Sequence, residues 1–84
     1  MTLFYLKRDV KNVGFTVTKK IGNAVVRNRT KRRLRALFLE FMDSLESGVY
    51  IIVAKQEIVN YSHKELKRDL KYTLKKLGVL DKGA

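Results

Sequence analysis

The 84-residue chain is strongly basic: 19 Lys and Arg against 8 Asp and Glu give a formal net charge of +11, while 45% of the residues are hydrophobic. This composition predicts one small globular domain over residues 1–84 and excludes a disordered or membrane-spanning chain, since no apolar run approaches the roughly 20 residues of a membrane helix. With no cysteine and no signal-peptide pattern, the sequence excludes a disulfide framework and a thiolate metal site, and we expect a cytoplasmic protein.

Two β-strands are predicted at the start of the chain. Residues 3–6 and 13–17 are rich in aromatic and β-branched side chains, and the polar segment KRDVKN between them is typical of a turn, so we expect a β-hairpin. In the second strand, apolar side chains such as Phe15 alternate with small or polar ones such as Thr16. We therefore expect one face of the sheet to pack on the core and the other to be flat and open.

A long helix is predicted after the second strand. It begins after Asn23, a suitable N-cap, and ends at Gly48, a residue able to adopt the left-handed conformation that terminates helices. The second half has the i, i+3, i+4, i+7 spacing of a core-facing helix, and its apolar residues are Leu34, Leu37, Phe38, Phe41, Met42 and Leu45. We expect only this half to pack deeply, because cations surround the first half.

A third strand and a second helix follow. Residues 49–54, VYIIVA, form a continuous apolar run that is typical of a central strand buried on both faces. Ser62 and Glu65 have the spacing of a capping box and open a helix that precedes Gly78. The apolar face of this helix consists of Leu66, Leu70, Leu74 and Leu77. The predicted order is therefore ββαβα, an α+β fold.

The first half of the long helix and the segment before it carry a run of cations without any acidic residue. These cations are Lys19, Lys20, Arg27, Arg29, Lys31, Arg32, Arg33 and Arg35. A solvated helix face normally mixes both signs, and cations in a first turn oppose the helix macrodipole. The run therefore indicates an external polyanion. RNA or DNA fits better than an anionic membrane, because the core of so small a domain requires the apolar face of the helix.

The acidic residues and the single histidine form no catalytic or metal-binding pattern. His63 has no second ligand or base partner at a useful spacing, and the i, i+4 pair Glu65 and Asp69 is typical of solvated charges. We therefore predict no catalytic residue, no metal site and no cofactor bound by the chain. This prediction argues against a self-sufficient nuclease.

The basic segment resembles the signature of the protein subunit of bacterial ribonuclease P, K-K-I-G-N-A-V-x-R-N-R-x-K-R-x-x-R. The matching residues are Lys19, Lys20, Ile21, Gly22, Asn23, Ala24, Val25, Arg27, Asn28, Arg29, Lys31, Arg32 and Arg35. The resemblance covers most of residues 3–77. It implies a two-layer α/β sandwich, similar to a fold of ribosomal proteins, with a small mixed sheet. It also implies that the basic helix makes a left-handed crossover between parallel strands, although right-handed crossovers are the rule.

The resemblance also implies a function. Proteins of this family assist a separate catalytic RNA, which uses RNA-bound Mg²⁺ to remove the 5′ leader of precursor tRNA, so the chain alone is expected to be inactive. The residues implied to bind RNA are Lys19, Lys20, Arg27, Asn28, Arg29, Lys31, Arg32 and Arg35. The alternative hypothesis is a non-enzymatic basic RNA-binding module of the ribosomal-protein kind.

In this family, aromatic residues on the open sheet face line a cleft for the leader, which agrees with the general use of aromatic stacking to hold single strands. Phe4 matches the family's position best, and Tyr5 is the alternative because a register slip of one residue exchanges the faces. Phe15 and Thr16 on the neighbouring strand are the other leader-binding candidates.

The chain departs from the family pattern at its start. Family members have a further N-terminal helix that forms one wall of the leader cleft, whereas this sequence starts at the first predicted strand. The resemblance is therefore to an N-terminally shortened member. It implies weaker leader binding and an uncovered apolar sheet face, which would favour a homodimer.

Overall fold

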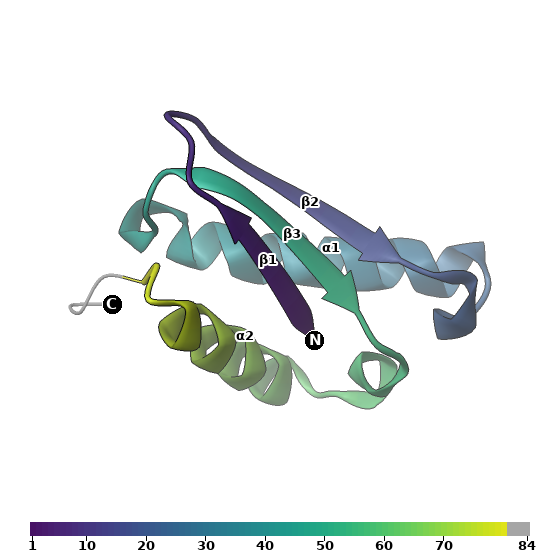
Figure 1. The fold of residues 1–84 in the computed structure, drawn as a ribbon. Coiled ribbons are helices and arrows are strands. Elements are labelled where there is room, and N and C mark those ends of the chain that lie inside the picture. The colour runs from purple at the N-terminus through teal and green to yellow at the C-terminus, as the bar shows by residue number, and fades with distance from the viewer. Residues whose placement is uncertain (81–84) are drawn as a thin grey trace.

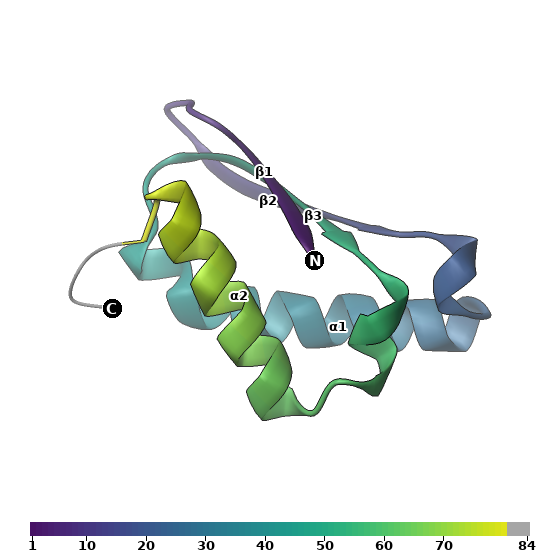
Figure 2. The ribbon, with the colours of Figure 1, turned by 60° about the horizontal axis from the view of Figure 1, so that its bottom comes forward.

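The computed structural model describes residues 1–80, which form a three-stranded sheet with two long helices (Figure 1). The strands are β1 (Thr2–Leu6), β2 (Lys11–Val17) and β3 (Gly48–Ala54), and the helices are α1 (Ala24–Phe41) and α2 (His63–Leu77). Three short 3₁₀ helices complete the chain: η1 (Lys19–Ile21), η2 (Met42–Ser44) and η3 (Gln56–Asn60). Both long helices lie on one side of the sheet (Figure 2). This arrangement confirms the predicted two-layer α+β fold.

The central strand of the sheet is β3, in the order β1-β3-β2. It pairs antiparallel with β1 and parallel with β2. The predicted hairpin is therefore wrong, because the strongly apolar β3 lies between the first two strands and pairs with both. In Figure 1, α1 passes behind the sheet from the end of β2 to the start of β3, and this crossover is left-handed, as the resemblance implied.

The sheet has one face packed against the helices and one open face. On the packed face, Tyr50 and Ile52 are fully buried, and the Phe15 ring meets the Phe38 ring edge to face at a centroid distance of 6.4 Å. On the open face, the side chain of Ile51 is 42% exposed. The prediction of a central β3 is confirmed, but its burial on both faces is wrong, because α1 and α2 cover the same face.

The start of α1 agrees with the sequence prediction and its end does not. The Asn23 side-chain oxygen accepts a hydrogen bond from the Val26 backbone N–H at 3.0 Å, which confirms the N-cap. The helix ends at Phe41 and continues as η2, so Gly48 is not its C-terminal cap. Gly48 instead opens β3, where its φ of +152° belongs to the region that favours glycine.

Replacing Gly48 with Ala is expected to lower the free energy of unfolding by about 2–4 kcal/mol. A Cβ atom at this position would clash with the Tyr5 ring and lie 2.7 Å from the carbonyl oxygen of Leu6. Urea denaturation measures the loss. Gly14→Ala is the matched control within the same sheet, because no atom lies within 4 Å of the Cβ position there. Equal losses in the two variants would contradict the steric explanation.

The second long helix has the predicted boundaries. Ser62 Oγ accepts a hydrogen bond from the Glu65 N–H at 3.1 Å, and the Glu65 carboxylate accepts one from the Ser62 N–H at 3.4 Å, which confirms the capping box. Gly78 follows the helix with a left-handed φ of +74°. The predicted leucines are buried except Leu77, because Val79 covers the core after the chain turns away from the helix.

Neither long helix of the described chain has the length and apolar character needed to cross a membrane.

Candidate nucleic-acid interface

The basic residues of α1 lie on its solvent side, along the outside of the helix layer. Asn28, Arg29, Lys31 and Arg32 are exposed, as predicted for the first half of the helix. Thr30 is an exception to the prediction, because it is buried and its hydroxyl donates to the Val26 carbonyl oxygen at 2.9 Å. The hydroxyl is thereby satisfied inside the helix, so a polar residue is tolerated at this position.

The first of two shallow grooves on this surface is lined by Val25, Asn28, Lys31, Arg32 and Arg35, and we call it the outer groove. The guanidinium carbon of Arg35 lies 5.7 Å from the centroid of the Phe15 ring, a cation–π distance. No carboxylate lines this groove. Neither of the two salt bridges found within residues 1–80 involves its cations, so they are free to meet an external anion.

The second groove lies between α1 and the start of α2, and we call it the interhelical groove. It is lined by Arg29, Arg32, Arg33, Ala36 and His63. From the sequence alone, His63 is expected to be an isolated solvent-exposed residue, and Arg33 is not among the residues implied to bind RNA. Only the packing of α2 against α1 brings the two residues together, and no sequence spacing between helices could have shown it.

Arg33 connects α1 to the segment before α2. Its Nη2 donates to the Tyr61 carbonyl oxygen at 2.5 Å, and its Nη1 donates to the Ile58 carbonyl oxygen at 3.5 Å. Ile58 belongs to η3 and is fully buried, so this contact holds η3 and the start of α2 against the core. Arg33 therefore has a structural role that the exposed arginines of α1, Arg29, Arg32 and Arg35, lack.

Replacing Arg33 with Met is expected to lower the free energy of unfolding by about 1–3 kcal/mol, because the carbonyl groups of Tyr61 and Ile58 lose their charged donor. Arg29→Met, at an exposed position of the same helix, is the control and should change stability by less than about 0.5 kcal/mol. Thermal denaturation of both variants measures the difference. A similar stability for the two would show that Arg33 does not hold the connection.

The remaining predicted cations surround the N-terminal end of α1. Lys19 and Lys20 are exposed in η1, and the Lys20 carbonyl oxygen accepts a hydrogen bond from Gln56 Nε2 at 2.8 Å. Arg27 is half-buried, and its Nη1 donates to the Gly22 carbonyl oxygen at 3.0 Å. Arg27 thus stabilises the turn between η1 and α1, whereas both lysines extend the cationic surface beyond the helix.

The strand register separates the four leader-binding candidates. Phe4 is 58% exposed and lies opposite Ile51 on the open face, and the exposed Thr16 lies on the same face. Tyr5 and Phe15 point to the helix-packed face instead. The Tyr5 hydroxyl donates to the Ser47 carbonyl oxygen at 2.6 Å. The structure therefore corrects the assignment of Tyr5 and Phe15, since residues of the packed face cannot line a cleft on the open one.

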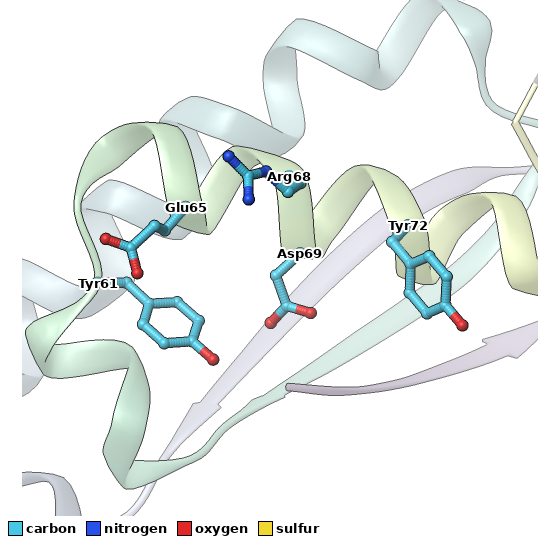
Figure 3. Close-up of a pocket in the computed structure, with 5 residues that line it drawn as sticks. All are labelled: Tyr61, Glu65, Arg68, Asp69 and Tyr72. Atoms are coloured by element: carbon cyan, nitrogen blue, oxygen red, sulfur yellow. The ribbon is translucent and has the colours of Figure 1, made fainter.

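The acidic residues of α2 line a depression on the side of that helix that faces away from the interhelical groove (Figure 3). It is lined by Tyr61, Glu65, Arg68, Asp69 and Tyr72. Partial burial and the nearby carboxylates of Asp69, Glu57 and Glu65 raise the pKa of Tyr61. Glu65 already belongs to the capping box. Among residues 1–80, no group of three or more His, Cys, Asp or Glu side chains lies close enough together to hold a metal ion.

Comparison with known proteins identifies the family. Residues 1–78 match the family model described as "Ribonuclease P". The chain is 37% identical over 75 residues to the ribonuclease P protein component of Nitratiruptor sp. and 42% identical over 72 residues to that of Geobacillus kaustophilus. The alignments cover 89% and 84% of this chain but 69% and 60% of the two relatives.

Solved structures agree with this result. The ribonuclease P protein of Staphylococcus aureus superimposes with a TM-score of 0.83 at 26% identity, covering 94% of this chain and 75% of that protein. The protein from Thermotoga maritima has the same fold, with a TM-score of 0.77 at 20% identity over 88% of this chain and 74% of the other. The K-K-I-G-N-A-V signature also lies at the start of α1, whose first half carries cations and no acidic residue. Together, these matches show that the chain belongs to the ribonuclease P protein family.

Proposed function

We propose that this chain is the protein component of a ribonuclease P ribonucleoprotein that removes the 5′ leader from precursor tRNA. In this proposal a separate RNA is the catalyst, and the hydrolytic metal ions are held by RNA. The chain contributes a binding surface and no catalytic residue. The observation that carries the proposal is the outer groove, which presents the family's signature cations without a neutralising carboxylate.

The outer groove suits an RNA backbone. Lys31, Arg32 and Arg35 supply ammonium and guanidinium donors along one side of α1, and each phosphate that they neutralise releases counterions and adds salt-dependent affinity. Asn28 can donate to or accept from a sugar or base edge in the same groove. This side of α1 therefore docks the protein on the catalytic RNA, with Lys19 and Lys20 extending the contact.

The open sheet face suits the single-stranded leader. Phe4 offers a ring for base stacking, and Thr16 offers a hydroxyl from the other edge strand. A second copy of this chain is a poorer partner for the same face, because each copy carries a formal charge of +11 and the two would repel each other. We therefore assign this face to RNA and not to a homodimer.

Reconstitution tests the proposal. A bacterial ribonuclease P RNA should cleave a 5′-labelled precursor tRNA at low Mg²⁺ concentration only when this chain is added, and the product should end at the mature 5′ terminus. The Lys31→Ala/Arg32→Ala/Arg35→Ala variant should fail to restore cleavage. A Phe4→Ala variant should bind the catalytic RNA normally but lose its preference for a substrate with a leader over one without it.

Three outcomes would count against the proposal. Cleavage by the chain after complete removal of RNA would make it a nuclease in its own right. Restored cleavage by the triple variant would remove the outer groove from the interface. RNA binding without any stimulation of cleavage, tested with several bacterial ribonuclease P RNAs, would indicate a general RNA-binding module.

A further inference from the structure

We propose that the interhelical groove binds a second phosphodiester segment of the partner RNA, separate from the segment in the outer groove. This inference rests on the proposed function and adds a second contact to it. The ligand class is backbone phosphate, and the residues that would bind it are Arg29, Arg32, Arg33 and His63; the exposed Ala36 completes the lining.

The two grooves face different directions. Asn28 and Arg35 line the outer groove. The next residue after each of them, Arg29 and Ala36, lines the interhelical groove. One residue turns an α-helix by about 100°, so a backbone that runs along the outer groove cannot also follow the interhelical one. Arg32 lines both grooves, and the five donors of its guanidinium can reach a phosphate on either side.

The interhelical groove is cationic, and no carboxylate lines it. Arg29 and Arg32 take part in neither of the salt bridges found in the described chain. Arg33 donates to two carbonyl groups, which are neutral, so its structural contacts leave the charge uncompensated. Cations gathered in this way repel one another until an anion joins them, and guanidinium groups match the geometry of phosphate oxygens.

The other two residues that line the interhelical groove, Ala36 and His63, suit a phosphate group. Ala36 has only a methyl group and leaves the space beside Arg32 and Arg33 open. His63, exposed at the start of α2, places an imidazole with N–H donor capacity on the opposite wall. Three guanidinium groups and an imidazole supply many N–H donors for phosphate oxygens, whereas the imidazole is the only possible metal ligand among the lining residues.

Three substitutions that each introduce a carboxylate distinguish the contributions of the two grooves to RNA binding. Ala36→Glu adds a negative charge to the interhelical groove and Val25→Glu adds one to the outer groove. Tyr72→Glu adds the same charge on the far side of α2, where the exposed side chain touches neither groove. Affinity for a bacterial ribonuclease P RNA is measured by filter binding after circular dichroism has confirmed folding. Both groove variants should bind roughly tenfold more weakly or worse, and Tyr72→Glu should change affinity by less than about threefold.

Crosslinking then identifies the bound segments. The chain has no cysteine, so Ala36→Cys and Val25→Cys each provide one thiol for a photoactivatable crosslinker. The two thiols should crosslink to different segments of the RNA. The inference is overturned if Ala36→Glu binds as tightly as Tyr72→Glu, if the Ala36→Cys conjugate gives no crosslink, or if both thiols mark one segment. Loss of binding by Val25→Glu alone would leave the proposed function intact, whereas normal binding by both groove variants would contradict that function too.

Discussion

The triple variant Lys31→Ala/Arg32→Ala/Arg35→Ala is expected to bind ribonuclease P RNA roughly 100-fold more weakly than the natural chain at about 0.1 M salt. The reason is counterion release: each lost phosphate contact lowers the salt exponent by about 0.7–0.9, so three contacts account for a loss of this size. A plot of log affinity against log salt concentration should accordingly become shallower by about 2. Binding titrations at several salt concentrations measure both quantities.

A charge-matched control separates this effect from the general attraction between a basic protein and RNA. Lys7→Ala/Lys75→Ala/Lys76→Ala removes the same formal charge from exposed positions in the β1–β2 turn and the C-terminal end of α2. These segments lie at the opposite end of the molecule from the N-terminal half of α1 (Figure 1). An equal loss of affinity in the control would show that net charge, and not the outer groove, determines binding.

Replacing Phe38 with Ala is expected to unfold most of the protein in the absence of RNA. Phe38 is fully buried in the last turn of α1, and its ring centroid lies 5.4 Å from that of Tyr50 and 6.4 Å from that of Phe15. Removing such a ring costs about 3–5 kcal/mol. A domain of this size has only about 4–13 kcal/mol of stability in total, and its +11 charge reduces that amount through self-repulsion.

Leu39→Ala is the control for this substitution, because Leu39 is the next residue of α1 and its side chain is 57% exposed. It should lower the free energy of unfolding by less than about 1 kcal/mol. Circular dichroism and urea denaturation compare the two variants. Since RNA binds the folded state, adding ribonuclease P RNA should restore helical structure to Phe38→Ala. Retention of a cooperative unfolding transition near that of Leu39→Ala would show that the Phe38 ring is not central to the core.

The elements of this protein that depend on local chemistry are those that the sequence predicted well. The N-cap at Asn23 and the capping box of α2 rely on side chains that bond to backbone groups within the same turn, so their spacing alone reveals them. The apolar repeat of α1 is equally local. The predictions failed where distant segments meet: the expected hairpin, the burial of both faces of β3 and the role of Gly48 all depend on which strands become neighbours.

The candidate site divides in the same way. The sequence alone predicts that α1 is half core and half cationic surface, because helical periodicity and the absence of acidic residues from its first half are visible along one segment. The strand register, which depends on the tertiary fold, places Phe4 and Thr16 on the open face and turns Tyr5 and Phe15 toward the helices. The tertiary fold also brings His63 beside Arg33, because the position of α2 depends on the shared core beneath both helices, and no pattern within either helix records that position.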